Sequence, residues 1–276
     1  MRTKIRVNTP QKRHFFWRFY FIFIRLKKKD NCVKIHYEDI VFYEVRRMKI
    51  AFVAPSCEEI APFNALLTDL QHSKQAGYDF YDGFYMGEKV SGVLCGIGKV
   101  NATIATMLLI EKTHPDLIIL GGVCGAIDDR LNVGDAVICE EVKHHDVADR
   151  FLTDNPPYYE SACFKADDQA VEKIREGLEK EEFDFDLYYG KLATGEQFIE
   201  DDGREEIKAN INPLGVDMET AAFAQACVAC GVRFVALRTV TDTPKERGLN
   251  AFHKNLEKAV VNEGKVLEKI FAVLKK

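Results

Sequence analysis

Short apolar runs alternate with amphipathic stretches from Met48 to the end of the chain, which predicts alternating strands and helices. The runs interpreted as strands are KIAFVAP (49–55), GVLCGIG (92–98), DLIILGGVCG (116–125), GDAVICEEV (134–142), GKLATGEQFI (190–199) and FVALRTVTD (234–242). Helical patterns cover 56–71, 99–113, 168–180, 203–210, 218–230 and 253–274. The LIIL stretch within 116–125 is continuously apolar, as expected for a strand that is covered on both faces.

This alternation favours a single-domain α/β fold, in which helices flank a central, largely parallel mixed sheet as a three-layer sandwich. No internal repeat or low-complexity linker interrupts the sequence after Met48, so residues 48–276 are assigned to one domain. In sheets of this kind, ligands bind beyond the carboxyl ends of the strands. The ends of the predicted strands are therefore where candidate chemistry is expected.

The first 47 residues follow a different pattern. Their apolar run from Phe15 to Ile24 contains Arg18, is too short to span a bilayer and lacks a small-residue cleavage site. Three interpretations stay open: a signal-anchor remnant, a basic amphipathic segment on a membrane surface, or upstream sequence that is not part of the functional protein. The third is favoured because the first predicted strand follows Met48 directly. No membrane association is expected for residues 48–276.

Charge is unevenly distributed along the 276 residues, of which 47% are hydrophobic. Residues 1–47 hold 13 Lys and Arg against 4 Asp and Glu, whereas the remaining residues hold 25 against 39. Binding to nucleic acid rests on clustered Lys and Arg that neutralise phosphates. The acidic remainder is therefore not expected to bind nucleic acid.

Eight cysteines occur without the spacing of a disulfide framework or a zinc site. Cys227 and Cys230 form a C-x-x-C, but it lies inside a predicted helix, whereas a reactive thiol is expected at the start of a helix. We interpret the cysteines as small buried hydrophobic residues. A reducing, cytoplasmic location is expected.

Two further motifs do not meet the requirements of a cofactor or metal site. GIGKVN (96–101) has Asn101 where a dinucleotide fingerprint needs a third glycine, and Val100 where a P-loop needs Ser or Thr. It is interpreted as a tight turn between a strand and a helix. In KHHDVAD (143–149), adjacent histidines on a strand would point to opposite faces and could not share one ion. Neither a cofactor nor a metal is expected.

Three separated carboxylates and one arginine remain as candidate chemistry. Glu59 follows the first predicted strand, and Asp242 closes the last one. Glu219 opens the helix that precedes this last strand, and Arg238 lies within the strand itself. Asp217, two residues before Glu219, is explained as a residue that starts a helix. Cleavage of a glycosidic bond requires carboxyl groups of this kind, to activate water and to protonate the leaving group.

The surrounding sequence resembles the nucleoside phosphorylase superfamily and, more closely, the 5'-methylthioadenosine/S-adenosylhomocysteine nucleosidase family. The resemblance extends from Met48 to the C-terminus, and VDMETAA with a downstream TD is its most specific part. The segments that carry it are, in order, MKIAFVAPSCEEI, GIGKVNA, DLIILGGVCGAIDDRLNVGDAVI, ATGEQFI, VDMETAAFAQAC and LRTVTDT.

The resemblance implies hydrolysis of the N-glycosidic bond of a 5'-thio-substituted adenosine, and it implies a role for each matching residue. Glu59 would activate water, and Asp242 would serve as the acid at N7 of the leaving adenine. The implied substrate-binding residues are Glu219 at the ribose 2'-hydroxyl, Met218 against the sugar, Arg238 near the water, Phe198 stacked on adenine, the backbone of Ile199 at its edge, Phe252 beside the 5'-thio group, and Val123 and Cys124 near base and ribose.

The loop after the first strand, APSCEEI, has no arginine, and Leu120 is apolar where phosphorylase relatives tend to have a basic side chain nearby. A phosphate dianion beside Glu58 and Glu59 would therefore be disfavoured, and water is the expected nucleophile. The family pattern is not kept at four positions near the expected base and ribose: Val123, Cys124, Glu196 and Gln197. The resemblance also implies a homodimer, with a contact around residues 144–151.

Two alternatives stay open. One is a related nucleoside phosphorylase or another purine nucleosidase. The other is a nucleoside-binding or storage protein on the same fold, against which the joint presence of Glu59, Glu219 and Asp242 argues. The order of preference among methylthioadenosine, adenosylhomocysteine and 5'-deoxyadenosine does not follow from the sequence.

Overall fold

A computed structural model describes residues 48–200 and 202–275, together with four short strands of the first 47 residues. The chain divides into the units Met1–Arg47 and Met48–Lys276, which are treated separately. In the first unit β1 (Tyr20–Ile22) pairs with β4 (Phe42–Glu44), and β2 (Lys28–Lys29) pairs with β3 (Cys32–Val33). The interpretation of residues 1–47 as an extension outside the functional protein falls mostly on residues that are not described.

The second unit is built on one mixed sheet with the order β12-β11-β13-β14-β10-β15-β9-β5-β8-β7-β6. Parallel pairs join β8, β5, β9, β15 and β10, and antiparallel pairs join the hairpin β6–β7 and the edge strand β12. The bounds are β5 Ile50–Ala54, β6 Thr68–Gln75, β7 Tyr78–Tyr85, β8 Glu88–Leu94, β9 Leu117–Leu120, β10 Val123–Ala126, β11 Ala136–His144, β12 Cys163–Lys165, β13 Leu187–Thr194, β14 Gly215–Asp217 and β15 Arg233–Asp242.

One half of this sheet closes on itself. Strand β11 pairs in parallel with β13 and also antiparallel with β15, so that β11, β13, β14, β10 and β15 form a ring. Strand β10 runs parallel to β15 but antiparallel to β14, which is itself parallel to β13. The carboxyl ends of β13 and β14 therefore lie beside the start of β10, and the candidate residues lie along β10 and its neighbours.

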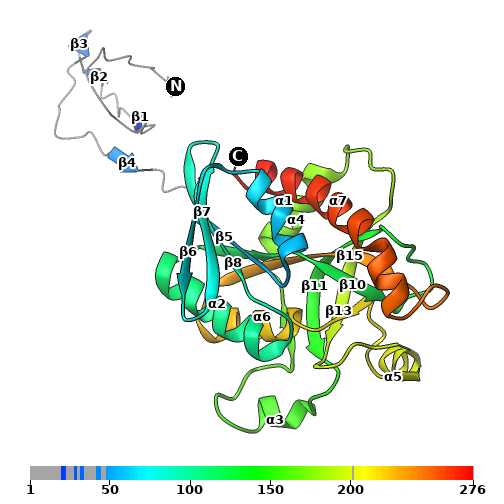
Figure 1. Ribbon diagram of the computed structural model, residues 1–276. Helices are drawn as coiled ribbons and strands as arrows, with labels where there is room; N and C mark the ends of the chain where they lie inside the picture. The colour runs from blue at the N-terminus through cyan, green and yellow to red at the C-terminus, as the bar shows by residue number, and fades with distance from the viewer. Residues whose placement is uncertain are drawn as a thin grey trace. The chain divides into compact units, whose positions relative to one another are not determined.

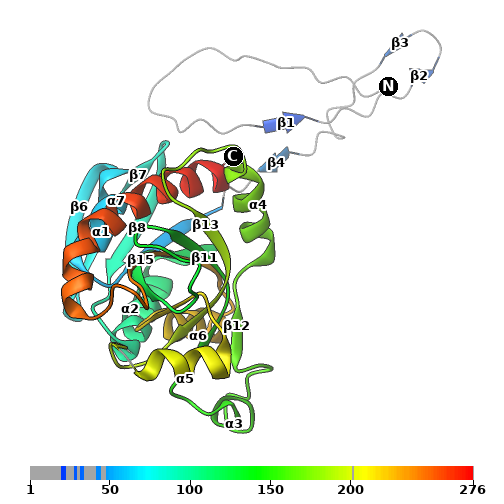
Figure 2. The same cartoon turned by 90° about the vertical axis from the view of Figure 1, so that its right-hand side faces the viewer.

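Helices cover both faces of the sheet, which completes the predicted three-layer arrangement (Figures 1 and 2). Helix α7 packs against α1 and α4, and α2 packs against α6. The bounds are α1 Cys57–Ala65, α2 Lys99–Thr113, α3 Asp149–Thr153, α4 Asp168–Leu178, α5 Asp202–Ile211, α6 Thr220–Ala229 and α7 Leu249–Leu274. Among the described residues, no helix combines the length and the apolar character that crossing a membrane would require.

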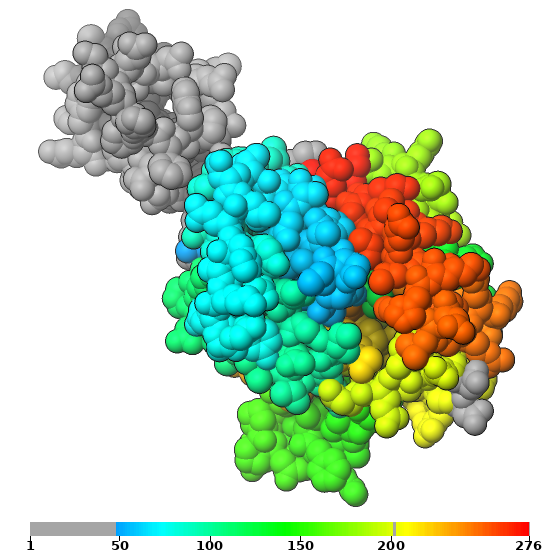
Figure 3. Space-filling view, viewed as in Figure 1, coloured from blue at the N-terminus to red at the C-terminus, as the bar shows by residue number. Residues whose placement is uncertain are grey.

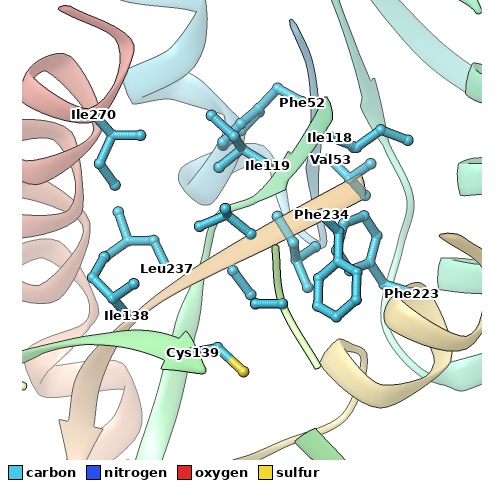
Figure 4. Packing of buried hydrophobic residues seen from close by; sticks show 14 of the residues in the cluster. Phe52, Val53, Ile118, Ile119, Ile138, Cys139, Phe223, Phe234, Leu237 and Ile270 are labelled. Atoms are coloured by element: carbon cyan, nitrogen blue, oxygen red, sulfur yellow. The ribbon is translucent and has the colours of Figure 1, made fainter. Parts of the chain in front are cut away.

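The hydrophobic core lies between the sheet and these helices (Figure 4). Phe52 and Phe63 stack with ring centroids 4.6 Å apart, and Phe223 meets Phe234 edge to face at 5.7 Å. Four cysteines are buried, and burial raises the pKa of their thiols: Cys95, Cys124, Cys139 and Cys227. These four thiols pack as apolar groups, in agreement with the interpretation from their spacing. That interpretation was wrong for Cys57, which is exposed, and only partly right for Cys163 and Cys230, which are half-buried.

The fold class predicted from the sequence is confirmed, but several boundaries were wrong. The helix predicted for 56–71 ends at Ala65, and Thr68 begins a strand that turns back at Ala76 and Gly77, both with positive φ. The single strand predicted for 116–125 is two strands interrupted at Gly121 and Gly122. The short elements α3, β12 and β14 were not predicted, because segments of three to five residues carry too little periodicity.

Candidate active site

Glu59 lies in the first turn of α1, which begins directly after β5. The Ser56 side chain caps this helix by accepting a hydrogen bond from the Glu59 backbone N–H at 3.2 Å. The Glu59 carboxylate is buried, and its Oε1 accepts from the backbone N–H of Val123 at 2.8 Å. Burial raises the pKa of Glu59, although Arg238 opposes the shift. A carboxylate held in this way can act as a base near neutral pH.

Glu219 precedes α6 and reaches across to the glycine-rich turn before α2. Its Oε1 accepts from the backbone N–H of Gly98 at 2.9 Å, and its Oε2 lies 3.3 Å from Arg238 Nη2. Burial raises the pKa of Glu219 to about 7, with Arg238 opposing and Asp217 reinforcing the shift. The GIGKVN segment therefore forms a turn, as interpreted, and its Gly98 N–H holds the Glu219 carboxylate in place.

Arg238 is completely buried at the centre of this group and faces three carboxylates. Its Nε lies 2.8 Å from Asp217 Oδ2, whereas its Nη1 is 3.9 Å from Glu59 Oε1. Burial alone would lower the pKa of Arg238, but Asp217 and Glu219 outweigh it and raise this pKa. Nη1 makes no hydrogen bond within the described part of the chain.

The structure corrects the interpretation of Asp217 as a residue that only starts a helix. Asp217 is buried at the end of β14, and its Oδ1 accepts from the backbone N–H groups of Glu219 and Thr220 at 3.2 and 3.1 Å. Oδ1 also accepts from the Thr194 hydroxyl at 2.6 Å. Asp217 therefore caps α6 and anchors Arg238 at the same time.

Asp242 closes β15 and is buried, as expected for a group that acts away from bulk water. Its Oδ1 accepts from the Thr241 hydroxyl at 2.8 Å, and its Oδ2 forms an ion pair with Arg204 Nη2. Arg204 belongs to α5 and also donates to the carbonyl oxygens of Ala126 and, at 3.1 Å, Glu200. Arg204 was not predicted as a site residue, although this arginine follows the ATGEQFI segment within six residues of its end.

Strand β10 links the two ends of the site. The Val123 N–H contacts Glu59, and two residues further along, Gly125 lies beside Asp242: a Cβ on Gly125 would be 3.0 Å from Asp242 Oδ2. Two residues of a strand span about 7 Å. The Glu59 and Asp242 carboxyl groups therefore lie at separate points along β10, as two groups that act on opposite sides of one bond would require.

The predicted apolar residues lie in separate parts of the unit, with Phe198 beside Phe252, Ile199 on a small apolar cluster, and Val123 and Cys124 within β10. The rings of Phe198 and Phe252 meet edge to face with centroids 5.9 Å apart, which joins the segment before α5 to the first turn of α7. These two segments border each other in Figure 3, in yellow and orange. The Ile199 side chain packs on a small cluster that contains Ile127 and Ile207. Met218 is half-buried, and Val123 and Cys124 are buried in β10.

Glu263 of α7 is a second residue that the sequence did not indicate. It is fully buried, and neither carboxyl oxygen has a hydrogen-bond partner among the described residues. A Cβ on Gly121 would clash with Glu263 Oε1, and a Cβ on Gly122 would lie 2.6 Å from Glu59 Oε1. Burial raises the pKa of Glu263 well above its ordinary value, and Glu59 adds to the shift. Burial without a partner therefore favours the neutral form of Glu263, which packs behind the break between β9 and β10.

The adjacent histidines point in different directions, as predicted. His144 Nε2 lies 3.1 Å from Gln225 Oε1 on α6, while His145 packs against Gly195. Within the described residues, no group of three His, Cys, Asp or Glu side chains is arranged to hold a metal ion. Glu196 follows β13, and its carboxylate reaches the start of α2, where it accepts from the Lys99 N–H at 3.2 Å.

Known proteins resemble this chain in sequence and in structure. A family model described as the phosphorylase superfamily matches residues 49–272. The chain is 34% identical to a 5'-methylthioadenosine/S-adenosylhomocysteine nucleosidase of Exiguobacterium, over 80% of this chain and 96% of that protein. The corresponding protein of Staphylococcus aureus strain MRSA252 is also 34% identical, over 82% and 100%.

A solved structure shares both the fold and the sequence pattern. The nucleosidase of Colwellia psychrerythraea, crystallised in complex with adenine, superimposes with a TM-score of 0.75 at 31% identity, covering 83% of this chain and 97% of its own. The enzyme of Neisseria meningitidis, in complex with methylthio-immucillin-A, gives a TM-score of 0.74 at 28% identity, covering 81% and 98%.

Proposed function

The chain belongs to the phosphorylase superfamily and, within it, to the 5'-methylthioadenosine/S-adenosylhomocysteine nucleosidases, and from this premise we propose that it hydrolyses the N-glycosidic bond of such nucleosides to adenine and a 5-thio-substituted ribose. The single observation that carries the proposal is the placement of two buried carboxyl groups at separate points of β10, with Glu59 at the Val123 N–H and Asp242 beside Gly125. Hydrolysis of a glycosidic bond needs one such group on each side of the bond.

Each candidate residue has a role in the proposed reaction. Glu59 accepts a proton from water as the water attacks the anomeric carbon. Arg238 Nη1, which has no hydrogen-bond partner among the described residues, lies 3.9 Å from Glu59 Oε1. Glu219 accepts the ribose 2'-hydroxyl, and Asp242 gives a proton to N7 of adenine. Phe198, the Ile199 backbone, Met218, Phe252, Val123 and Cys124 surround the base, the sugar and the 5'-thio group.

Water rather than phosphate is the proposed nucleophile because of the charge around Arg238. This guanidinium is the cation closest to Glu59 in the described site, and Asp217 and Glu219 already engage it. A phosphate dianion placed there would face three carboxylates without a free positive partner. A water molecule carries no such penalty.

The test is release of adenine from 5'-methylthioadenosine by the purified full chain in phosphate-free buffer. Adenine release that is unchanged by added phosphate is expected. Release that depends on phosphate would instead identify a phosphorylase, and binding without release would identify a nucleoside-binding protein. Adenosylhomocysteine, 5'-deoxyadenosine, inosine and uridine as alternative substrates would define the preferred nucleoside.

The same proposal includes a homodimer. Helix α2 exposes Val100, Ile104 and Met107, which are 66%, 42% and 43% accessible and share one face at helical spacing. The segment around α3 projects from the body of the unit in Figure 3, in green, and exposes Phe151 and Tyr158. Contiguous apolar residues at a surface are typical of protein interfaces. A second copy of this chain is the proposed occupant.

A further inference from the structure

The guanidinium of Arg204 lies inside the base-binding end of the proposed site, although it comes from α5 and not from the catalytic strands. Its side chain is 4% exposed and that of Asp242 is 2% exposed. A Cβ on Gly125 would be 3.1 Å from Arg204 Nη2 and 3.0 Å from Asp242 Oδ2, so the two charged groups lie side by side over this glycine. The absence of a side chain at Gly125 makes room for both.

Within the described part of the chain, the contacts of Arg204 engage three of its N–H groups. A guanidinium has five N–H groups. Nε–H donates to Glu200, one N–H of Nη1 donates to Ala126, and one N–H of Nη2 donates to Asp242. One further N–H on each of the two terminal nitrogens has no acceptor among the described residues.

The two purine classes present different groups to such a pair. Beside N7, adenine carries an amino group that donates, whereas a 6-oxopurine carries an oxygen that accepts. A carboxyl group satisfies the adenine pattern by donating at N7 and accepting from the amino group. A guanidinium matches two acceptors, which is why arginine commonly binds O6 and N7 of guanine. Negative charge that develops on O6 and N7 of a departing 6-oxopurine would also be stabilised by Arg204.

We infer that Arg204 is a specificity-determining residue, and that the site cleaves 5'-thio-substituted nucleosides of 6-oxopurines as well as those of adenine. This inference rests on the proposed nucleosidase function and extends it to a second class of leaving base. In the 6-oxopurine complex, Arg204 donates to O6 and remains beside Asp242. In the adenine complex, the amino group of adenine donates to the Asp242 carboxyl group in place of Arg204 Nη2.

The test compares release of adenine from 5'-methylthioadenosine with release of hypoxanthine from 5'-methylthioinosine in phosphate-free buffer. The unmodified chain is expected to release both bases. R204M should lower kcat/KM for methylthioinosine relative to methylthioadenosine by roughly ten- to hundredfold, the discrimination typical of a lost bidentate base contact. K208M is the matched control, because Lys208 lies on the same helix and pairs with Asp129 at the surface; its ratio should match that of the unmodified chain.

R204K separates recognition from structural support, since lysine keeps the charge beside Asp242 but loses the planar fork. It should still lower the ratio, and its unfolding temperature shows whether the fold is kept. Adenine release without hypoxanthine release by the unmodified chain would overturn the inference and leave the proposed function standing. Equal losses for both substrates in R204M and R204K would also overturn it, by reducing Arg204 to a support for Asp242. Release of neither base would contradict the proposed function itself.

Discussion

Arg238 Nε lies 2.8 Å from Asp217 Oδ2, closer than any distance from this guanidinium to Glu219 or Glu59. Asp217 therefore fixes the arginine, while Glu219 and Glu59 keep oxygens available for other partners. One cation shared among three buried carboxylates also means that these groups do not ionise independently. The pH behaviour of the site follows from this arrangement.

The acid assigned to Asp242 is tested by Asp242→Asn. Loss of a general acid should lower kcat for methylthioadenosine by about 10²- to 10⁴-fold. The substitution also leaves the buried Arg204 charge without its carboxylate, so a lower unfolding temperature is expected as well. Turnover close to that of the unmodified chain would contradict the assignment. Asp128→Asn is the control, because Asp128 pairs with Arg130 near the surface.

The base assigned to Glu59 is tested by Glu59→Gln. An amide keeps the size of the side chain and can still accept from the Val123 N–H, but it cannot take a proton from water. Steady-state kinetics should show a fall in kcat of roughly 10²-fold or more with a smaller change in KM. Glu58→Gln, which alters the exposed neighbour, should leave both constants unchanged. An effect confined to KM would assign Glu59 to binding only.

The pKa of about 7 at Glu219 predicts a pH dependence of kcat/KM. Only the ionised carboxylate accepts the ribose hydroxyl without competition from its own proton, so kcat/KM should rise as the pH increases through about 7. Below this pH the protonated form prevails, and activity should fall about tenfold per pH unit. In Glu219→Gln this limb of the profile should disappear. A profile with the same limb in the variant would assign the ionisation to another group.

Because the pKa of Glu263 is raised, we expect the contribution of this residue to the free energy of unfolding to decrease as the pH rises. Its pKa is raised in the folded state, so the folded chain holds a proton that the unfolded chain releases above its ordinary pKa of 4.5. The contribution is fully present below pH 4.5 and is lost as the pH rises, by about 1.4 kcal/mol per unit. Urea unfolding at pH 5 and pH 8 should show that Glu263→Gln gains stability over the unmodified chain at the higher pH. An equal difference at both values would mean that Glu263 is ionised when folded.

The proposed homodimer is tested by Ile104→Glu, which places a charge in the apolar face of α2. Burying an unpaired carboxylate in an interface is strongly unfavourable, so the molar mass from light scattering should fall from that of a dimer to that of a monomer. Val261→Glu, at a residue of α7 that is 54% exposed, should leave the molar mass unchanged. A monomeric unmodified chain would exclude the dimer directly.

Local sequence patterns determine much of the fold. The alternation of apolar runs and amphipathic stretches after Met48 determined the α/β class, and it predicted α2 at its observed limits, Lys99–Thr113. Hydrophobic periodicity is local, because each residue's burial reflects the face of its own element. The carboxylates Glu59, Glu219 and Asp242 could also be identified, since each stands where a strand or a helix begins or ends.

Only the tertiary structure decided which charges meet. Arg204 reaches Asp242 over 38 residues of sequence, Glu263 packs behind Gly121 from the last helix, and Asp217 anchors Arg238 although a helix-start role had seemed sufficient. The hairpin β6–β7 and the break at Gly121 and Gly122 were likewise not predicted. A buried ion pair is specified by the closure of the sheet and the packing of helices on it, and no local sequence pattern records the partner of a charged side chain.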